Sequence, residues 1–512
     1  MMKRLTNRDE VEDAEHLIAE VLDSQAEWLY AENQTSAQVA VRRGEWEIKV
    51  WHERLLLSVW VDQGTRMWRV VAWEWTGEKL RLEAVRRLGH ERAALELVPR
   101  ASARVAVATV TDARRAACAR LATLACALVP GAKVKRIGLS AGPRRNQPGR
   151  YARIMLRLGR TLTAVSGPVV DLEESQADAF VSSTLVWFQR ISEKATDARK
   201  LKLWLVVTES LAEAVAERCA LLRDSWRSVI EIYKIDEARQ ELLPVPINSL
   251  HELLAQAPRF HHPPRQATSE LAARLGDLMP EAIDVVRAGH GETLRFRGLA
   301  FARVRRVACN ERAWFGLDRG RRQQLDESSW PELLKLIDKL IEHRRAGASD
   351  NYHALYAAAP EAWLESLLRR SITDLDPGLI ISPLHTQLRT STKTGAGARP
   401  VDLVALRQDG RLVVIELKVS EDAAFPLQGA DYWRRVETHR RHGNLARSRL
   451  FGEKKLAAEP PLVYLVAPLL RFHRAFQTLA QLVAPEIEMY RFDINEDCRE
   501  RVRVMRRTRV NP

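Results

Sequence analysis

The chain has 512 residues, of which 46% are hydrophobic and 29% charged, and its formal net charge is +14. This length is enough for roughly three or four domains, and the composition excludes a fibre and global disorder. A positive excess of this size is common in proteins that bind nucleic acid, although an arginine-rich surface kept for solubility gives the same balance.

The cysteines and the N-terminus indicate where the protein works. The five cysteines are scattered, odd in number and include no C-x-x-C pair, a pattern that suggests a reducing compartment and neither a disulfide framework nor a zinc cluster. Residues 1–10 lack the apolar core of a signal peptide, and no run is apolar enough to span a membrane. We therefore expect a soluble, cytoplasmic protein without a membrane partner, and its oligomeric state stays undefined.

Residues 1–135 are predicted to form an N-terminal helix followed by a β-rich domain. The apolar stripe of residues 8–31 predicts an amphipathic helix. Alternating residues and regularly placed glycines then predict strands over residues 39–99. Tryptophans are frequent in this stretch and could stack on bases, but packing in the sheet core is the favoured interpretation. They are Trp46, Trp51, Trp60, Trp68, Trp73 and Trp75.

Residues 136–258 are predicted to form an α/β domain. A strand, a helix and a second strand are expected over residues 202–208, 209–222 and 229–235. The sequence of this region contains no cluster of ligand-type side chains, so it assigns no chemistry to the domain.

Residues 266–346 follow a proline-rich break and are predicted to form a basic β-hairpin and helix unit. In residues 294–297 and 303–305 the arginines share one strand parity and the apolar residues the other, which gives one cationic and one apolar face. A solvated surface would explain the arginines, but their density favours contact with a nucleic-acid backbone. The candidate substrate-binding residues of this face are Arg295, Arg297, Arg303 and Arg305.

Three charged residues lie in a predicted hairpin of apolar strands near the C-terminus. Two strand-like runs flank Asp409-Gly410, which predicts a tight turn. Asp402 lies near the start of the first strand, and Glu416 and Lys418 lie two residues apart on the second, so the latter two share a face. Pairing of the strands should bring Asp402 beside Glu416.

This arrangement predicts a metal-dependent reaction. Buried charges are costly unless they are paired or bind a metal, and oxygen donors that repel one another suit Mg²⁺ or Mn²⁺. Such a cation polarises a phosphodiester and activates a bound water, and Lys418 can orient that water and stabilise the developing charge. The simpler alternative is a structural ion pair between Glu416 and Lys418.

The order of Asp402 followed by Glu416-x-Lys418 resembles the motif of the PD-(D/E)xK nuclease superfamily. Val401 separates Asp402 from the preceding proline, so the literal Pro-Asp pair is stretched without loss of a ligand. The resemblance implies that all three residues are catalytic and that the two carboxylates bind the metal.

The resemblance also extends to the flanking helices. Superfamily members carry a glutamate on the helix before the hairpin, which implies Glu365 as the third catalytic and metal-binding carboxylate, with Glu361 as the alternative. After the hairpin, Gln428 and Tyr432 are one helical turn apart and resemble the Gln-x-x-x-Tyr element of RecB-type members, where the pair supports the site and contacts substrate. The block also resembles NucS-type endonuclease domains and covers about a fifth of the chain.

Together these features predict a multidomain α/β (α+β) protein whose residues 350–512 form a restriction-endonuclease-like domain, with a central mixed sheet flanked by helices. The expected activity is hydrolysis of phosphodiester bonds with Mg²⁺ or Mn²⁺ as cofactor. DNA is the expected partner, in repair or in defence against foreign DNA. The alternatives are an RNA nuclease of the same fold, a nucleic-acid-binding protein without catalysis, and a scaffold whose N-terminal sheet binds another protein.

Overall fold

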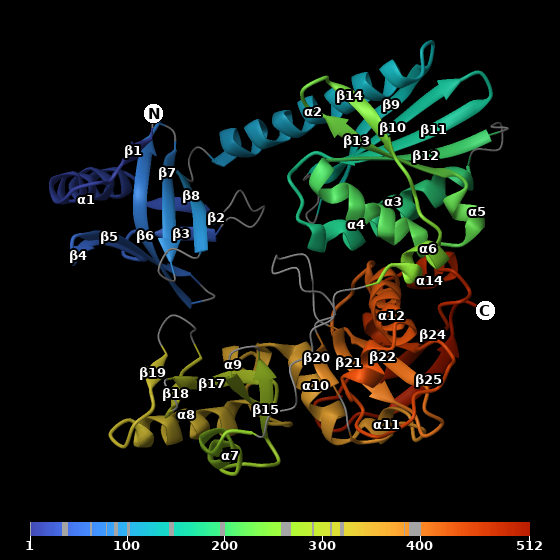
Figure 1. The fold of residues 1–512 in the computed structure, drawn as a ribbon. Coiled ribbons are helices and arrows are strands. Elements are labelled where there is room, and N and C mark those ends of the chain that lie inside the picture. The colour runs from blue at the N-terminus through green and yellow to red at the C-terminus, as the bar shows by residue number, and fades with distance from the viewer. Residues whose placement is uncertain are drawn as a thin grey trace. The chain divides into compact units, whose positions relative to one another are not determined.

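The computed structural model shows a multidomain protein that contains both helices and sheets. The chain divides into two compact units, Met1–Ala117 and Cys118–Pro512, and the described residues form four sheets (Figure 1). This confirms the predicted α and β architecture, whereas the division into four domains stays a prediction. The structure describes residues 2–512 except for 33–38, 62–63, 78, 87–90, 100–102, 143–147, 195–199, 258–267, 289–290, 308–309, 318–321, 383–384 and 389–400.

Two general features of the chain concern its environment. Within the described ranges, no helix combines the length and the apolar character needed to cross a membrane. The cysteines that the structure describes, Cys118, Cys126, Cys219 and Cys498, are free thiols, and Cys309 lies outside the described residues.

The first unit is an antiparallel sheet with one helix, α1 (Arg8–Asp23), packed against it. The strands follow the order β3-β2-β8-β7-β6-β5-β4, and β1 pairs with β6. The β-rich N-terminal region is therefore confirmed. Its strands are β1 (Lys3–Arg4), β2 (Glu27–Glu32), β3 (Val39–Arg42), β4 (Trp46–Trp51), β5 (Arg54–Val61), β6 (Gly64–Trp75), β7 (Leu80–Arg86) and β8 (Glu91–Pro99).

The predicted helix over residues 8–31 is wrong in its last third. Helix α1 ends at Asp23, and residues 27–32 form strand β2 instead. Trp28 and Tyr30 point into the core from this strand, and the Trp28 indole donates a hydrogen bond to the Leu22 carbonyl at 2.8 Å. The alternation of these two large side chains is the period of a strand and outweighs the helical stripe that precedes it.

The tryptophans of the first unit divide into two groups. Trp68 and Trp73 are buried in the sheet core, and Trp46 and Trp75 pack partly against it, as the favoured interpretation predicts. Trp51 and Trp60 do not follow it, because 60% and 39% of their surfaces are exposed.

The second sheet is mixed and lies between helices. Its order is β14-β13-β12-β11-β10-β9, with β11, β12 and β13 parallel to one another. Helices α3 (Ala177–Ser192) and α4 (Glu209–Ala220) cover one face and α2 (Ala103–Leu128) the other (Figure 1). The predicted strand–helix–strand unit is confirmed as β12, α4 and β13. The strands are β9 (Lys133–Ala141), β10 (Pro148–Leu158), β11 (Thr161–Pro168), β12 (Lys200–Val207), β13 (Ile230–Asp236) and β14 (Glu241–Val245).

The third sheet is an antiparallel meander with one face against helices α7 (Glu270–Gly276) and α8 (Trp330–His343). Leu294 and Val304 are fully buried on that face. Arg303 and Arg305 lie on the opposite face, so the predicted division into an apolar and a cationic face is confirmed. The strands are β15 (Ile283–Ala288), β16 (Gly291–Phe296), β17 (Leu299–Val307), β18 (Asn310–Phe315) and β19 (Gln323–Gln324).

The fourth sheet is the predicted central mixed sheet. Strands β20, β21 and β22 are antiparallel, β22, β23 and β24 are parallel, and β25 returns antiparallel. Helices α10 (Pro360–Arg370) and α11 (Ile372–Leu375) pack on one face. Helices α12 (Phe425–Arg441) and α14 (Phe476–Leu482) lie on the other. The strands are β20 (His385–Leu388), β21 (Val401–Leu406), β22 (Leu412–Leu417), β23 (Leu462–Pro468), β24 (Met489–Ile494) and β25 (Val504–Arg509).

The second and fourth sheets are joined by one continuous hydrophobic core. Phe180 and Val215, from α3 and α4, belong to the same buried cluster as Trp433 and Phe476, from α12 and α14. Main-chain hydrogen bonds cross the same boundary, such as that from the Ala484 amide to the Leu221 carbonyl at 2.8 Å. Residues 350–512 therefore depend on the preceding α/β region for part of their core.

Helix α12 lies at the centre of this shared core, and most of its 17 residues are buried. Its Asp431 is 1% exposed. The carboxylate forms ion pairs with three arginines, Arg218 at 3.1 Å, Arg434 at 2.7 Å and Arg435 at 2.6 Å. Arg218 also binds Asp178 at 2.7 Å. Burial raises the pKa of Asp431, but the three guanidinium groups together hold it well below its usual range.

We predict that Asp431→Asn destabilises the whole second unit. The substitution keeps the shape but leaves buried guanidinium groups short of a counter-charge, which typically costs about 3–5 kcal/mol. The urea midpoint of the full chain should fall accordingly. The matched control is Asp224→Asn, because Asp224 also pairs with an arginine but is 92% exposed. Equal midpoints for the two variants would contradict the role of the buried cluster.

Candidate functional site

The predicted hairpin is present as β21 and β22. Leu403 pairs with Ile415 and Leu406 with Leu412, so Asp402 lies beside Glu416, as expected. The turn requires Gly410, whose φ is 84° and where an added Cβ would meet the Lys455 carbonyl at 2.7 Å. The register of the two carboxylates is thus set by the turn.

The three charged residues of the hairpin are in contact. The Lys418 ammonium donates to Glu416 Oε1 at 2.8 Å, and the Leu417 amide donates to Asp402 Oδ2 at 3.1 Å. Glu416 is 1% exposed and Lys418 8%. The shared face of Glu416 and Lys418 is therefore confirmed.

The electrostatics of the hairpin distinguish it from a simple ion pair. Burial raises the pKa of Glu416 well above its usual range, the charge of Asp402 raises it further, and Lys418 lowers it. Burial likewise raises the pKa of Asp402. The pKa of Lys418 is raised because Glu416 and its neighbours outweigh the effect of burial. One lysine therefore faces two neighbouring carboxylates, whose like charges disfavour ionisation of both.

The helix carboxylate whose charge acts on this pair is Glu361, the alternative to Glu365. The role of Glu365 as the third carboxylate stays a prediction. Glu361 interacts with the Val419 amide, and burial together with Asp402 raises its pKa while Lys418 lowers it. Glu365 instead lies 3.6 Å from Arg295. The two glutamates are one turn apart on α10, so the rotation of the helix about its axis decides which of them reaches the hairpin.

Gln428 and Tyr432 meet as predicted. The Gln428 amide donates to the Tyr432 hydroxyl at 3.0 Å, and both residues are almost fully buried. Burial raises the pKa of Tyr432, and the nearby charges of Glu416 and Asp402 raise it further. The pair therefore lies against the acidic site and supports it from within α12, and its predicted contact with substrate stays a prediction.

The arginines assigned to the cationic face do not all reach solvent. Arg297 lies in the turn after β16 with a φ of 43°, and it donates to the Arg344 carbonyl at 2.7 Å. Arg295 points to Glu365, whereas Arg303 is half-buried and Arg305 exposed on the outer face. The prediction that all four arginines lie on one exposed cationic face is therefore wrong for Arg295 and Arg297, because α10 and the segment after α8 cover them.

A buried arginine that the sequence did not reveal positions helix α10. Arg344 is fully buried and donates to main-chain carbonyls on both sides of the junction, including Phe296 at 3.1 Å and Ala358 at 2.6 Å. Burial lowers its pKa to about 9. Ala359, the N-cap residue of this helix, has a φ of 42°. No sequence signal distinguishes Arg344 from its arginine neighbours, because its acceptors are backbone atoms.

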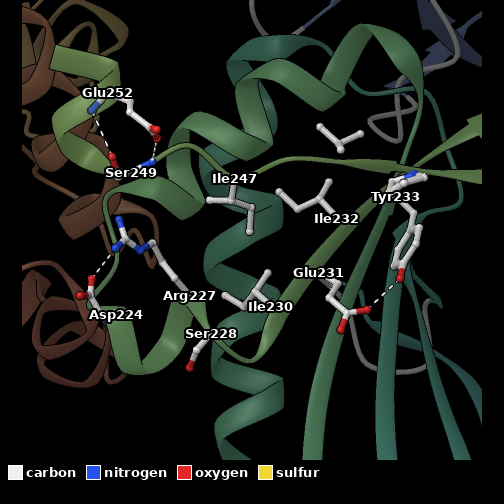
Figure 2. Close-up of a pocket in the computed structure, with 12 residues that line it drawn as sticks. Asp224, Arg227, Ser228, Ile230, Glu231, Ile232, Tyr233, Ile247, Ser249 and Glu252 are labelled. Carbon is white, nitrogen blue, oxygen red and sulfur yellow. Dashed lines mark hydrogen bonds and ion pairs between the residues drawn. The ribbon is translucent and has the colours of Figure 1, made fainter. Parts of the chain in front are cut away.

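The described part of the second unit includes two cavities of similar volume. One of about 790 Å³ adjoins the acidic site and is lined by Glu361, Val419, Tyr356 and Arg499, among others. The other, of about 740 Å³, lies beside strand β13 (Figure 2). The side chains of Ser249 and Glu252 each accept a hydrogen bond from the other residue's backbone amide, and Tyr233 donates to Glu231, so we assign the cavity no chemistry.

The residues of the hairpin suit a divalent cation. Glu416 Oε2 is buried without a hydrogen-bond partner. Asp402 and Glu416 offer carboxylate oxygens, the ligand type that Mg²⁺ and Mn²⁺ prefer, and a cation between them would offset their repulsion. Among the described ranges, no group of three or more His, Cys, Asp and Glu side chains is close enough to hold a metal. Asp402 and Glu416 are the two carboxylates that the hairpin brings together, and the metal-binding role of Glu365 stays a prediction.

Comparison with known proteins adds little. No family model matches the chain, and no curated protein matches it. Among solved structures, the chain is similar to one described as "Structure of EndoMS-dsDNA2 complex", with a TM-score of 0.16 and 11% identity, over 46% of this chain and 96% of that chain. A likeness this weak assigns neither fold nor activity, so the functional argument depends on the geometry of the site.

Proposed function

We propose that the protein is a metal-dependent nuclease that hydrolyses phosphodiester bonds, with DNA as its substrate. One observation carries the proposal. Buried Glu416 and half-buried Asp402 lie side by side with raised pKa values, and Lys418 donates to Glu416 at 2.8 Å. A structural role would be served by a single ion pair, whereas a second buried carboxylate is costly without a cation.

Each residue of the site has a role in this proposal. Asp402 and Glu416 would hold Mg²⁺ or Mn²⁺, which when bound polarises the phosphodiester and lowers the pKa of a water molecule. Lys418 orients the attacking water and stabilises the charge that develops on the phosphate oxygens. Glu361 faces Lys418 and Asp402 and keeps the ammonium group charged and in place. Gln428 and Tyr432 hold the buried side of Glu416.

The positive charge of the chain supports a nucleic-acid substrate. The formal net charge is +14, and cationic surfaces bind phosphate backbones through release of counterions. An RNA nuclease of the same fold is the second candidate, because the site chemistry acts on either backbone. A binding protein without catalysis would not need the buried acidic pair.

Cleavage should require both the divalent cation and Lys418. We predict that purified protein cuts labelled single-stranded, duplex or branched DNA, or RNA, in Mg²⁺ or Mn²⁺ and not in EDTA. Lys418→Ala should lower the rate by about 10²–10³-fold, the usual effect of losing a group that stabilises transition-state charge. Binding should largely survive, since many basic contacts supply affinity. Cleavage by this variant at the parent rate would make Lys418 a structural partner only.

Glu361 should matter more for catalysis than Glu365. Glu361→Gln removes a charge beside Lys418 and Asp402 and should lower the cleavage rate by about 10–100-fold, as supporting residues of metal sites do. Glu365→Gln is the matched control on the same helix and should leave the rate nearly unchanged. Urea midpoints of both variants separate folding from chemistry. A larger loss of cleavage rate in Glu365→Gln than in Glu361→Gln would identify Glu365 as the supporting carboxylate of the site.

A further inference from the structure

The outer face of the third sheet carries a row of polar and aromatic side chains. Thr293 pairs with Arg303, Arg303 with Trp314, and Trp314 with Gln324. The row therefore crosses four neighbouring strands on the face opposite the buried residues of this sheet. Trp314 is half-buried and Gln324 exposed, so an indole ring lies between a guanidinium group and an amide at the surface.

Two arginines stand directly opposite each other in the next row of the same face. Arg305 and Arg312 are cross-strand partners, and both are exposed. Glu311 does not reach them, because it pairs with Arg306 at 3.6 Å. Among the described residues neither Arg305 nor Arg312 forms an ion pair. Like charges directly opposite each other on a sheet repel and are destabilising. An anion bound between the two guanidinium groups would offset this repulsion.

The same face leads to the helix that borders the acidic site. Two residues back along the strands, Asp284 pairs with Arg295, and there α10 covers the sheet. Asp284 accepts from Ser366 at 2.5 Å and from Arg370 at 2.9 Å. Helix α10 also carries Glu361. The open part of the face is thus one row away from the helix that approaches Lys418.

We propose that this open face, formed by Thr293, Arg303, Arg305, Arg312, Trp314 and Gln324, binds single-stranded nucleic acid. The phosphates would lie along the arginines, and a base would stack on Trp314. A sheet face with a partly exposed aromatic side chain and cationic neighbours suits unstacked bases. Every base has a π-face that can stack on the aromatic ring. Single-stranded DNA and RNA both offer phosphates and unstacked bases, so either can be the ligand. The delivery of the strand toward Glu361 rests on the proposed nuclease function, whereas the binding does not.

Binding of labelled single-stranded DNA, single-stranded RNA and duplex DNA by the full chain in EDTA tests the aromatic part. Trp314→Ala should weaken binding of single strands about tenfold, within the usual range for one stacked base, and affect duplex much less. Trp314→Phe should retain most of the affinity. Trp51→Ala is the control, because Trp51 is an exposed tryptophan of the other unit. Equal losses for single strand and duplex, or no loss beyond that of the control, overturn the proposal.

The cationic part is tested by the salt dependence of the same binding. Arg305→Gln with Arg312→Gln should reduce the log–log salt slope on single strands by about 1.4, since each contact contributes about 0.7. The control pair is Arg136→Gln with Arg160→Gln, because both residues are exposed, Arg136 in β9 and Arg160 in the turn between β10 and β11. Equal slopes for the two pairs overturn the proposal.

The result is separable from the proposed nuclease activity. If the variants bind as predicted but the parent cuts nothing in Mg²⁺, the hydrolysis fails and the binding face stands. If the parent cuts and the variants bind as the parent does, the binding face fails alone.

Discussion

The burial of Asp431 among three arginines is the interaction on which the rest of the second unit depends. It fixes helix α12 between the fourth sheet and the helices of the second sheet, where Arg218 reaches across from α4. Because the charges are buried together, removing one leaves the others uncompensated. The same helix presents Gln428 and Tyr432 to the acidic pair. The position of the site is therefore set by contacts far from it in sequence.

The site consists of three charged residues, Asp402, Glu416 and Lys418, which neighbouring helices hold on an otherwise apolar sheet. One side is supported by α12 and the other by α10, whose start Arg344 ties to the third sheet. Neither Asp402 nor Glu416 can move away without breaking the hairpin register. Such a rigid pair of carboxylates suits a small cation that demands fixed oxygen donors, and the neighbouring sheet adds a cationic face without disturbing it.

Local patterns were enough to predict the hairpin, the shared face of Glu416 and Lys418, the contact of Gln428 with Tyr432, and the apolar and cationic faces of the third sheet. These features depend on periodicity within one or two elements. The approach of Glu361 to the hairpin and the contact of Glu365 with Arg295 depend on how α10 is rotated against two sheets. The predicted helix over residues 8–31 failed because the burial of Trp28, decided by tertiary packing, outweighed the local stripe.

The central claim is that Asp402 and Glu416 form an acidic pair that is unfavourable until a cation binds. The most direct measurement compares the unfolding of the parent and Glu416→Gln from acid to alkaline pH, with EDTA or Mn²⁺. The folded-state pKa of Glu416 is raised, so in EDTA the parent should lose stability relative to the variant as pH rises above about 4.3, the unfolded value. Mn²⁺ should then stabilise the parent and not the variant. A variant that is less stable than the parent at alkaline pH, with equal effects of Mn²⁺ on both, would contradict the account.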